Sequence, residues 1–259
     1  MLHKTSPHSI HEAWPALKTA KGFLLDWDGC CAIGNRLVPE AADFLRQHQN
    51  RAAIVSNNST NTVGDFLNLL ADQGIEMRED QVVLAGVEAL NQAAESGGEP
   101  ALVLGDPRMR ALARSLGIEM VQQDAGLVVL LRDTRFSYRR LERAVNAIRN
   151  GARLIVANPD ATHPAGQGRL MPETGALLAA IKACVDVPAG AMDIIGKPSP
   201  HLFRKGCEAL GTTHADTVMI GDNPLTDVRG ASALGMRTCL VDSPPGDFFR
   251  RLERLLKTA

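Results

Sequence analysis

Short apolar runs alternate along the chain with segments in which apolar positions recur every three to four residues. Runs of this kind are typical of buried strands, and the wider spacing is typical of amphipathic helices. The expected strands are 23–25, 52–55, 82–84, 101–104, 126–131, 154–157, 193–195, 217–220 and 236–241. The expected helices are 39–49, 62–73, 86–96, 108–115, 138–149, 174–183, 200–209 and 224–234. The alternation predicts a parallel, doubly wound α/β sheet with both faces covered.

Unusual polar side chains come directly after several expected strands. They are Asp26 with Asp28, Ser56, Lys197, and Asp222 with Asp227 a few residues later. In an open parallel sheet the ligand crevice lies beyond the carboxyl ends of the strands. An Asp-Gly turn, a helix cap or a surface charge explains each position taken alone. Their shared place at strand ends predicts a functional site.

These residue types suit phosphoryl transfer. Two carboxylates one residue apart, Asp26 and Asp28, repel each other unless a cation lies between them or one keeps its proton. Hard oxygen ligands favour Mg²⁺ as that cation. A lysine, a hydroxyl and backbone N–H groups can bind phosphate oxygens, and one carboxylate remains available as a nucleophile.

Four segments carry a family resemblance. DWDG (26–29), the apolar strand ending at Ser56, GKP (196–198) and GDNPLTD (221–227) occur in this order and resemble the four motifs of haloacid dehalogenase-like (HAD) phosphatases. VSNNST (55–60), ANPD (157–160) and GKPSP (196–200) resemble the NagD-like branch, class IIA. The resemblance spans about residues 20–245. It implies a Rossmann-like core with an inserted α/β class II cap. The implied activity is Mg²⁺-dependent hydrolysis of a small phosphometabolite, such as a nucleotide or sugar phosphate, through an aspartyl-phosphate.

The spacing of the motifs predicts where the inserted domain lies. Asp26 and Ser56 are 30 positions apart, which accommodates a loop, a helix and a strand. Ser56 and Lys197 are 141 positions apart, far more than one βα unit needs. We therefore expect a core domain at 1–80 and 183–259 and a cap domain at 81–182.

The resemblance assigns roles to the motif residues. Asp26 is the expected nucleophile, and Asp28 is the expected acid/base that gives the metal only its backbone carbonyl. Asp26, Asp28 and Asp222 form the expected metal site. The expected substrate-binding residues are Gly29, Ser56, Asn57, Asn58 and Lys197, and the expected supporting residues are Asp227 and Asn223. A loop rich in glycine, proline and polar residues is expected at 161–172. The longer polar segment around it, 158–175, is the expected source of substrate specificity, through Asp160, His163, Arg169 and Glu173.

Composition and charge limit the partners and the location that we expect. The net charge of −1 and the lack of a basic cluster give no support to nucleic-acid binding or to a peripheral membrane protein. Five cysteines without a CxxC pair predict a reduced, cytoplasmic chain, and no apolar run reaches the length of a membrane span. The expected partner is a small phosphorylated metabolite, and a homodimer through the cap is the expected form of any assembly.

Several alternatives stay open at this point. A phosphomutase or phosphotransferase would use the same motifs. A dehalogenase needs only one carboxylate after the first strand, so Asp28 disfavours it. A signalling receiver domain is about half this length. A non-catalytic phosphate-binding protein is disfavoured because every motif position is present.

Overall fold

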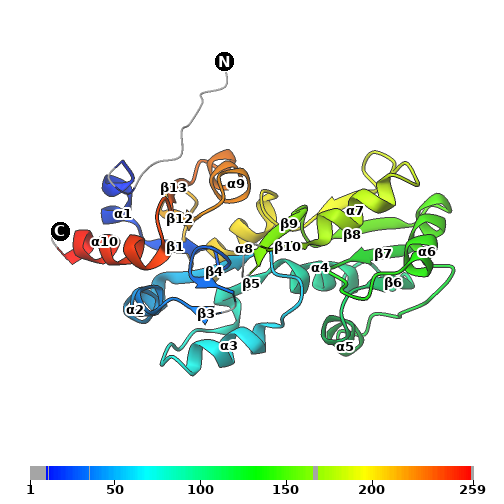
Figure 1. Ribbon diagram of the computed structural model, residues 1–259, viewed down its shortest axis with the longest axis horizontal. Coiled ribbons are helices and arrows are strands. Elements are labelled where there is room, and N and C mark those ends of the chain that lie inside the picture. The colour runs from blue at the N-terminus through cyan, green and yellow to red at the C-terminus, as the bar shows by residue number, and fades with distance from the viewer. Residues whose placement is uncertain (1–9, 11, 35, 166–168, 258–259) are drawn as a thin grey trace, which may run out of the picture. The chain divides into compact units, whose positions relative to one another are not determined.

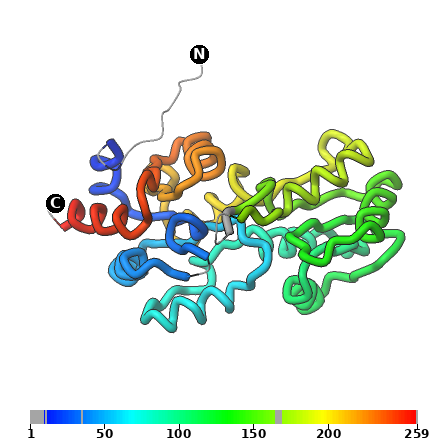
Figure 2. The backbone as a smooth tube through the Cα atoms, in the orientation of Figure 1, coloured from blue at the N-terminus to red at the C-terminus, as the bar shows by residue number. Residues whose placement is uncertain are grey.

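The computed structural model describes residues 10, 12–34, 36–165 and 169–257. Contacts divide the chain into two compact units, coloured along the sequence in Figure 2. The first unit comprises Met1–Ser56, Val63–Val83 and Lys197–Ala259, and the second comprises Asn57–Thr62 and Leu84–Gly196. The chain therefore passes from one unit to the other four times.

The first unit is built on a five-stranded sheet in the order β13-β12-β1-β4-β5 (Figure 1). Its strands are β1 (Gly22–Leu25), β4 (Ala52–Ser56), β5 (Val82–Leu84), β12 (Thr217–Gly221) and β13 (Arg237–Leu240). The pairs β1–β12, β1–β4 and β12–β13 are parallel. Every residue of β1, β4, β5 and β12 is buried. Burial on both faces explains why these strands are continuous apolar runs rather than alternating ones.

The strand order creates a topological switch point between β1 and β12. From β1 the sheet grows through β4 and β5 in one direction, and through β12 and β13 in the other. The backbone N–H of Asp26 donates to the Ile220 carbonyl at 2.9 Å, just where the two central strands end. Ligands of open α/β sheets bind beyond the carboxyl ends at such a point.

Helices and a small hairpin complete the first unit. The helices are α1 (Trp14–Thr19), α2 (Pro39–His48), α3 (Val63–Ala71), α8 (Pro200–Ala209), α9 (Arg229–Ala233) and α10 (Pro245–Lys257), with shorter turns η1 (Gln49–Arg51), η2 (Glu79–Gln81) and η4 (Pro224–Val228). Strands β2 (Ala32–Ile33) and β3 (Arg36–Leu37) pair antiparallel. Proline opens α2, where its fixed φ suits the first helical position and its missing N–H costs nothing. Phe44 of α2 packs against Phe23 and Phe249, with ring centroids 5.3 and 5.4 Å apart.

The second unit has its own four-stranded parallel sheet in the order β11-β8-β7-β6. Its strands are β6 (Ala101–Leu104), β7 (Leu127–Leu130), β8 (Arg153–Val156) and β11 (Met192–Ile194), and its helices are α4 (Ala85–Ala94), α5 (Pro107–Ser115), α6 (Tyr138–Arg149) and α7 (Thr174–Lys182). Leu102, Val128 and Leu154 project from one face into a core with Ile148 of α6 and Ile181 of α7. Two parallel sheets with helices confirm the α/β prediction.

A hairpin stands where the sequence predicted a loop at 161–172. β9 (Thr162–Ala165) and β10 (Arg169–Pro172) pair antiparallel, with His163 opposite Met171. Residues 166–168 of the predicted loop lie outside the described residues. Prolines at 164 and 172 weakened the strand signal. A two-stranded ribbon consists only of edge strands, which tolerate proline.

The unit boundaries fall at different positions from the predicted domain boundaries. Val82 and Val83 of β5 belong to the first unit, whereas the predicted cap began at 81. The second unit continues to Gly196, whereas the predicted cap ended at 182, because β11 pairs with β8. A short apolar run indicates a strand without indicating which sheet contains it.

Among the described residues, every helix is too short or too polar to cross a bilayer.

Candidate functional site

Four charged side chains meet in the first unit beyond the carboxyl ends of β1 and β12. Asp26, Asp222 and Asp227 each offer an oxygen, and these oxygens all lie within 4.8 Å of one another. Lys197 Nζ lies 2.5 Å from Asp26 Oδ1 and 2.7 Å from Asp227 Oδ1. We call these four residues the carboxylate cluster. The structure thus brings together residues that the sequence placed after three separate strands.

Two glycines make room for the carboxylates. A Cβ on Gly221 would lie 2.2 Å from Asp227 Oδ2, and that same oxygen accepts a hydrogen bond from the Asn223 N–H at 3.1 Å. A Cβ on Gly29 would lie 2.3 Å from Asp222 Oδ2, and Gly29 also has a positive φ of 84°. Only glycine meets both demands at position 29.

Burial dominates the electrostatics of the cluster. It raises the pKa of Asp26 to about 7, a rise that Lys197 opposes and Asp222 reinforces. Burial likewise raises the pKa of Asp227 to about 6, and it is the main reason that the pKa of Asp222 is raised. Burial alone would lower the pKa of Lys197, but Asp227 and Asp26 together raise it above its ordinary value. Lys197 therefore stays charged.

The balance of charge fits a divalent cation. Three carboxylates facing one ammonium leave two negative charges uncompensated when all groups are ionised. A cation of charge +2 among them would neutralise this excess and offset the repulsion between the carboxylates, which adds to the effect of burial on their pKa values. All three candidate donors are carboxylate oxygens, which suit a hard cation such as Mg²⁺ or Ca²⁺ better than a soft one. The residues present therefore fit a metal site.

Asp28 and Gly29 follow Asp26 along the chain, and Ser56 ends the strand next to β1. Asp28 is exposed on the turn after β1, and the Gly29 N–H closes that turn by donating to the Ala32 carbonyl at 2.9 Å. Ser56 is the last residue of β4, the neighbour of β1, and is buried. Asn223 caps η4, since its side-chain oxygen accepts the Leu225 N–H at 2.9 Å.

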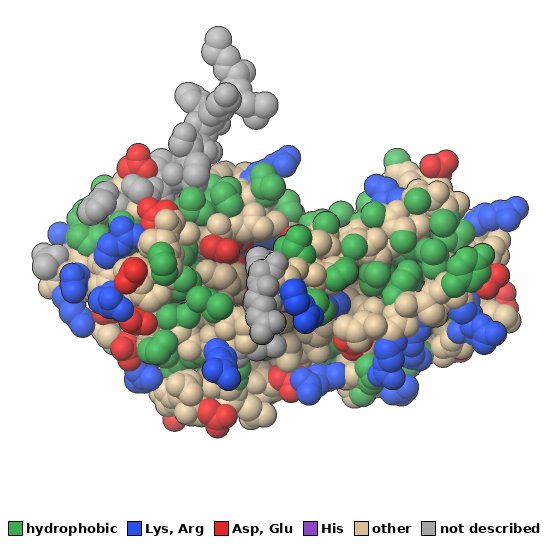
Figure 3. Space-filling model, viewed as in Figure 1, with side chains coloured by type: hydrophobic (Ala, Val, Ile, Leu, Met, Phe, Trp, Pro, Cys, Tyr) green, Lys and Arg blue, Asp and Glu red, His purple; other side chains and the backbone are tan. Residues whose placement is uncertain are grey.

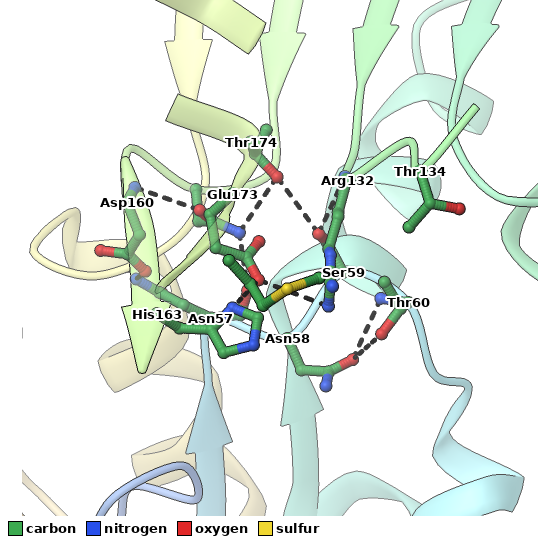
Figure 4. A network of polar contacts seen from close by, with 12 residues as sticks. Asn57, Asn58, Ser59, Thr60, Arg132, Thr134, Asp160, His163, Glu173 and Thr174 are labelled. Atoms are coloured by element: carbon green, nitrogen blue, oxygen red, sulfur yellow. Dashed lines mark hydrogen bonds and ion pairs between the residues drawn. The ribbon is translucent and has the colours of Figure 1, made fainter. Parts of the chain in front are cut away.

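The asparagines after Ser56 belong to the second unit, and their side chains have partners there (Figure 4). Asn57 Nδ2 donates to Asp160 Oδ2 at 2.8 Å. Asn58 Oδ1 accepts the N–H groups of Thr60 and Asn61 at 3.1 and 2.9 Å. These hydrogen bonds hold both side chains within the second unit.

His163 and Glu173 come together in the second unit with Arg132, which sequence analysis missed. Glu173 Oε1 lies 2.6 Å from His163 Nδ1 and 3.5 Å from Arg132 Nη1. Burial raises the pKa of Glu173, and Arg132 and His163 oppose that rise. We call these three residues the Glu173 group. Arg132 comes two positions after the end of the strand at 127–130, so the rule that located the first site could have located Arg132 as well.

Arg169, the fourth residue expected to contact the leaving group, is on the hairpin. Its side chain is exposed on β10, and Nη2 lies 3.8 Å from Met171 Sδ.

Two family models match the chain. The model described as haloacid dehalogenase-like hydrolase matches residues 23–119, and the one described as HAD-hydrolase-like matches residues 194–247. The two matches contain the segments that carry Asp26, Ser56, Lys197 and Asp222.

Curated relatives match over nearly their whole length. The 5'-nucleotidase YutF of Bacillus subtilis is 31% identical over 230 residues, which are 87% of this chain and 88% of the relative. The acid sugar phosphatase of Staphylococcus haemolyticus is 29% identical over 233 residues, or 88% of this chain and 87% of the relative. The dihydroxyacetone phosphatase of Corynebacterium glutamicum is 30% identical over 232 residues, covering 87% and 82%.

Solved structures show the same likeness. A p-nitrophenyl phosphatase from Archaeoglobus fulgidus superposes with a TM-score of 0.77 at 28% identity, covering 85% of each chain. NagD from Escherichia coli superposes with a TM-score of 0.75 at 25% identity, covering 87% of this chain and 89% of that one. These likenesses confirm the predicted NagD-like fold.

Proposed function

The chain belongs to the haloacid dehalogenase-like hydrolase family and is a phosphatase of that family, and from this premise we propose that it hydrolyses small phosphate monoesters with Mg²⁺ through an aspartyl-phosphate. The observation that carries the proposal is the carboxylate cluster. It combines a candidate nucleophile, an excess of two negative charges and a buried lysine at the switch point of the sheet.

Asp26 is the proposed nucleophile. One of its oxygens attacks phosphorus, the bond from phosphorus to the ester oxygen breaks, and the alcohol leaves. Water then attacks the aspartyl-phosphate, which releases inorganic phosphate and restores the carboxylate. Lys197 already lies 2.5 Å from Asp26 Oδ1, where its charge lowers the repulsion between a carboxylate and a phosphate dianion.

Asp28 is the proposed general acid and base. It gives a proton to the leaving oxygen in the first step and takes one from the attacking water in the second. Asp28 lies on the turn after β1, two positions after Asp26, which supports a role beside the proposed nucleophile.

Ser56 and the backbone N–H groups that follow it are the proposed ligands of the phosphate oxygens, with Gly29 on the turn beside them. For Asn57 and Asn58 the proposed ligands are the backbone N–H groups, because their side chains already bond to residues of the second unit.

Asp26, Asp222 and the Asp28 carbonyl would hold Mg²⁺. When bound, the ion would supply positive charge that offsets the negative charge of the phosphate and of the carboxylates. Asp227 supports the site by its ion pair with Lys197. The backbone N–H of Asn223 donates to Asp227, so Asp227 and Asn223 together orient Lys197 toward the phosphate.

The proposed substrates are small phosphorylated metabolites. The relatives named above are a nucleotidase, a sugar phosphatase and a dihydroxyacetone phosphatase, which share only the phosphate monoester. Discrimination among leaving groups is proposed to depend on the second unit, through His163 and Glu173 and with Asp160 and Arg169 as further candidates.

A homodimer through the second unit and a cytoplasmic location are parts of the same proposal. Hydrophobic side chains gather around α6 and α7 on the face shown in Figure 3. Leu141, Leu177 and Val187 are among the partly buried residues over the core of that unit. An apolar face of this kind suits a protein contact.

Phosphate release tests the proposal. The purified chain should release phosphate from p-nitrophenyl phosphate and from some members of a panel of nucleotides, sugar phosphates and triose phosphates. EDTA should stop the release and excess Mg²⁺ should restore it. Turnover that persists in EDTA would contradict the metal site. An isomerised ester without free phosphate would indicate a mutase, and tight phosphate binding without turnover would indicate a binding protein.

A further inference from the structure

Two of the four passages between the units lie directly beside proposed phosphate ligands. The chain leaves the first unit after Ser56, and it returns to the first unit at Lys197. The residues on the far side of these two peptide bonds are Asn57 and Gly196. Whatever fixes Asn57 and Gly196 therefore acts on Ser56 and Lys197 through a single peptide link.

Asn57 and Gly196 are fixed to the same short segment at the end of β8. Asn158 Nδ2 donates to the Asn57 carbonyl at 2.8 Å, and the Gly196 N–H donates to the Ala157 carbonyl at 2.7 Å. Asp160 accepts from Asn57 Nδ2 at 2.8 Å, which adds a second attachment. Both connections are therefore anchored to residues 157–160.

The side-chain amide of Asn158 is held in one orientation, because its nitrogen and its oxygen both have hydrogen-bond partners. Its Nδ2 also lies 3.3 Å from Thr174 Oγ1, and its Oδ1 accepts the Asp160 N–H at 3.1 Å. Asn158 and Thr174 are buried, so a rotated amide would leave polar groups without partners.

Gly196 shows how tightly the two connections are packed. A Cβ at this position would lie 2.6 Å from Asn57 Oδ1, 2.6 Å from the Ala157 carbonyl oxygen and 2.9 Å from Asn158 Cβ. Its φ is not positive, so glycine is required here by space alone. Gly196 and Asn57 thus lie against each other, although 139 positions separate them in the sequence.

We propose that Asn57, Asn158 and Gly196 form a connection clamp that positions Ser56 and Lys197 for the phosphate group. This inference rests on the proposed roles of Ser56 and Lys197. The clamp residues are positioning residues, since they act through the two connections. The clamp serves every substrate equally, because the phosphate is common to all of them.

Inorganic phosphate and p-nitrophenyl phosphate test the clamp in the full-length chain with Mg²⁺. Gly196→Ala keeps every hydrogen-bonding group but forces Asn57 and Ala157 apart, and Asn158→Leu removes the amide at similar size. Each should raise the inhibition constant of phosphate and the KM for p-nitrophenyl phosphate about tenfold. kcat/KM should fall by one common factor for esters with different leaving groups.

Gly126→Ala is the matched control. Its Cβ would lie 3.7 Å from Glu99 Cβ, an ordinary contact, in the same unit and at an unstrained φ. It should leave all constants unchanged. Thermal unfolding separates positioning from simple damage, since a merely structural role lowers Tm and leaves the phosphate inhibition constant at its wild-type value below Tm.

Two results would overturn the clamp. One is a wild-type phosphate constant in a folded Gly196→Ala variant, and the other is a loss that depends on the leaving group. If Asn158→Leu does not fold, Gly196→Ala alone decides between these outcomes. A wild-type chain without phosphatase activity would refute the proposed function instead, so the two failures are distinguishable.

Discussion

The carboxylate cluster and the Glu173 group are both charged, yet their charges are balanced differently. In the cluster three carboxylates face one lysine, and Lys197 is 1% exposed. In the Glu173 group a single carboxylate faces the guanidinium of Arg132 and the imidazole of His163, all partly exposed. A buried excess of charge is costly and points to a ligand of opposite charge, whereas a balanced group serves to orient its members. The comparison supports the proposal that the chemistry belongs to the first unit and leaving-group recognition to the second.

Of the substitutions proposed here, Asp26→Asn should have the largest effect, a loss of turnover at the carboxylate cluster. The amide is nearly isosteric but a poor nucleophile, so we expect kcat to fall by about 10⁴-fold or more. Lys197 keeps its ion pair with Asp227, and the fold should persist. Steady-state kinetics and circular dichroism measure the two effects.

Asp43→Asn, on the exposed face of α2, is the control and should behave as wild type. Appreciable turnover by Asp26→Asn would remove Asp26 from the role of nucleophile.

Lys197→Met should show how much the buried excess of negative charge lowers the free energy of unfolding. Without the ammonium, Asp26 and Asp227 lose their ion-pair partner while remaining buried. We expect the free energy of unfolding to fall by about 3–5 kcal/mol, measured by urea denaturation in EDTA.

Lys205→Met, at an exposed position of α8, should change the unfolding free energy by less than about 0.5 kcal/mol. If the two substitutions lowered the unfolding free energy equally, the buried excess of charge would carry no such cost.

Glu173→Gln should have the smallest effect and change selectivity rather than rate. It leaves Arg132 without its carboxylate, so an ester whose leaving group carries a carboxylate should gain. We expect kcat/KM for 3-phosphoglycerate relative to glycerol 3-phosphate to rise roughly five- to tenfold, with kcat for p-nitrophenyl phosphate nearly unchanged.

Glu99→Gln provides the control, because Glu99 is paired with Arg153 on the exposed surface of the same unit. An unchanged ratio for Glu173→Gln would exclude the Glu173 group from leaving-group recognition.

Sequence reasoning located the parts of the site that follow strands. Asp26, Lys197 and Asp222 each come after an apolar run, and parallel strands bring such residues to one edge. The same logic covers Arg132, which was missed because the strand before it carries no recognisable motif.

The remaining features depend on contacts that leave no periodic signal. Gly196 faces Asn57 across 139 positions, and nothing in either local sequence indicates the other. β11 could have joined either sheet, since an apolar run records burial but not its partner. The β9–β10 hairpin was not predicted because its prolines argue against a strand. Proline excludes a central strand but is compatible with an edge strand, and the sequence does not distinguish the two.

The sheet of the first unit also determines when its strands can pair during synthesis of the chain. β1 pairs with β12 across 195 positions, Gly22 with Thr217. At about 5–20 residues per second, a ribosome needs about 10–40 seconds to synthesise the chain between them. During that interval one edge of β1 lacks the strand that covers it in the finished protein, and an uncovered apolar edge is a template for aggregation. Lys197 lies in the last quarter of the sequence, so Asp26, the proposed nucleophile, has no counter-ion from Lys197 until that part of the chain emerges.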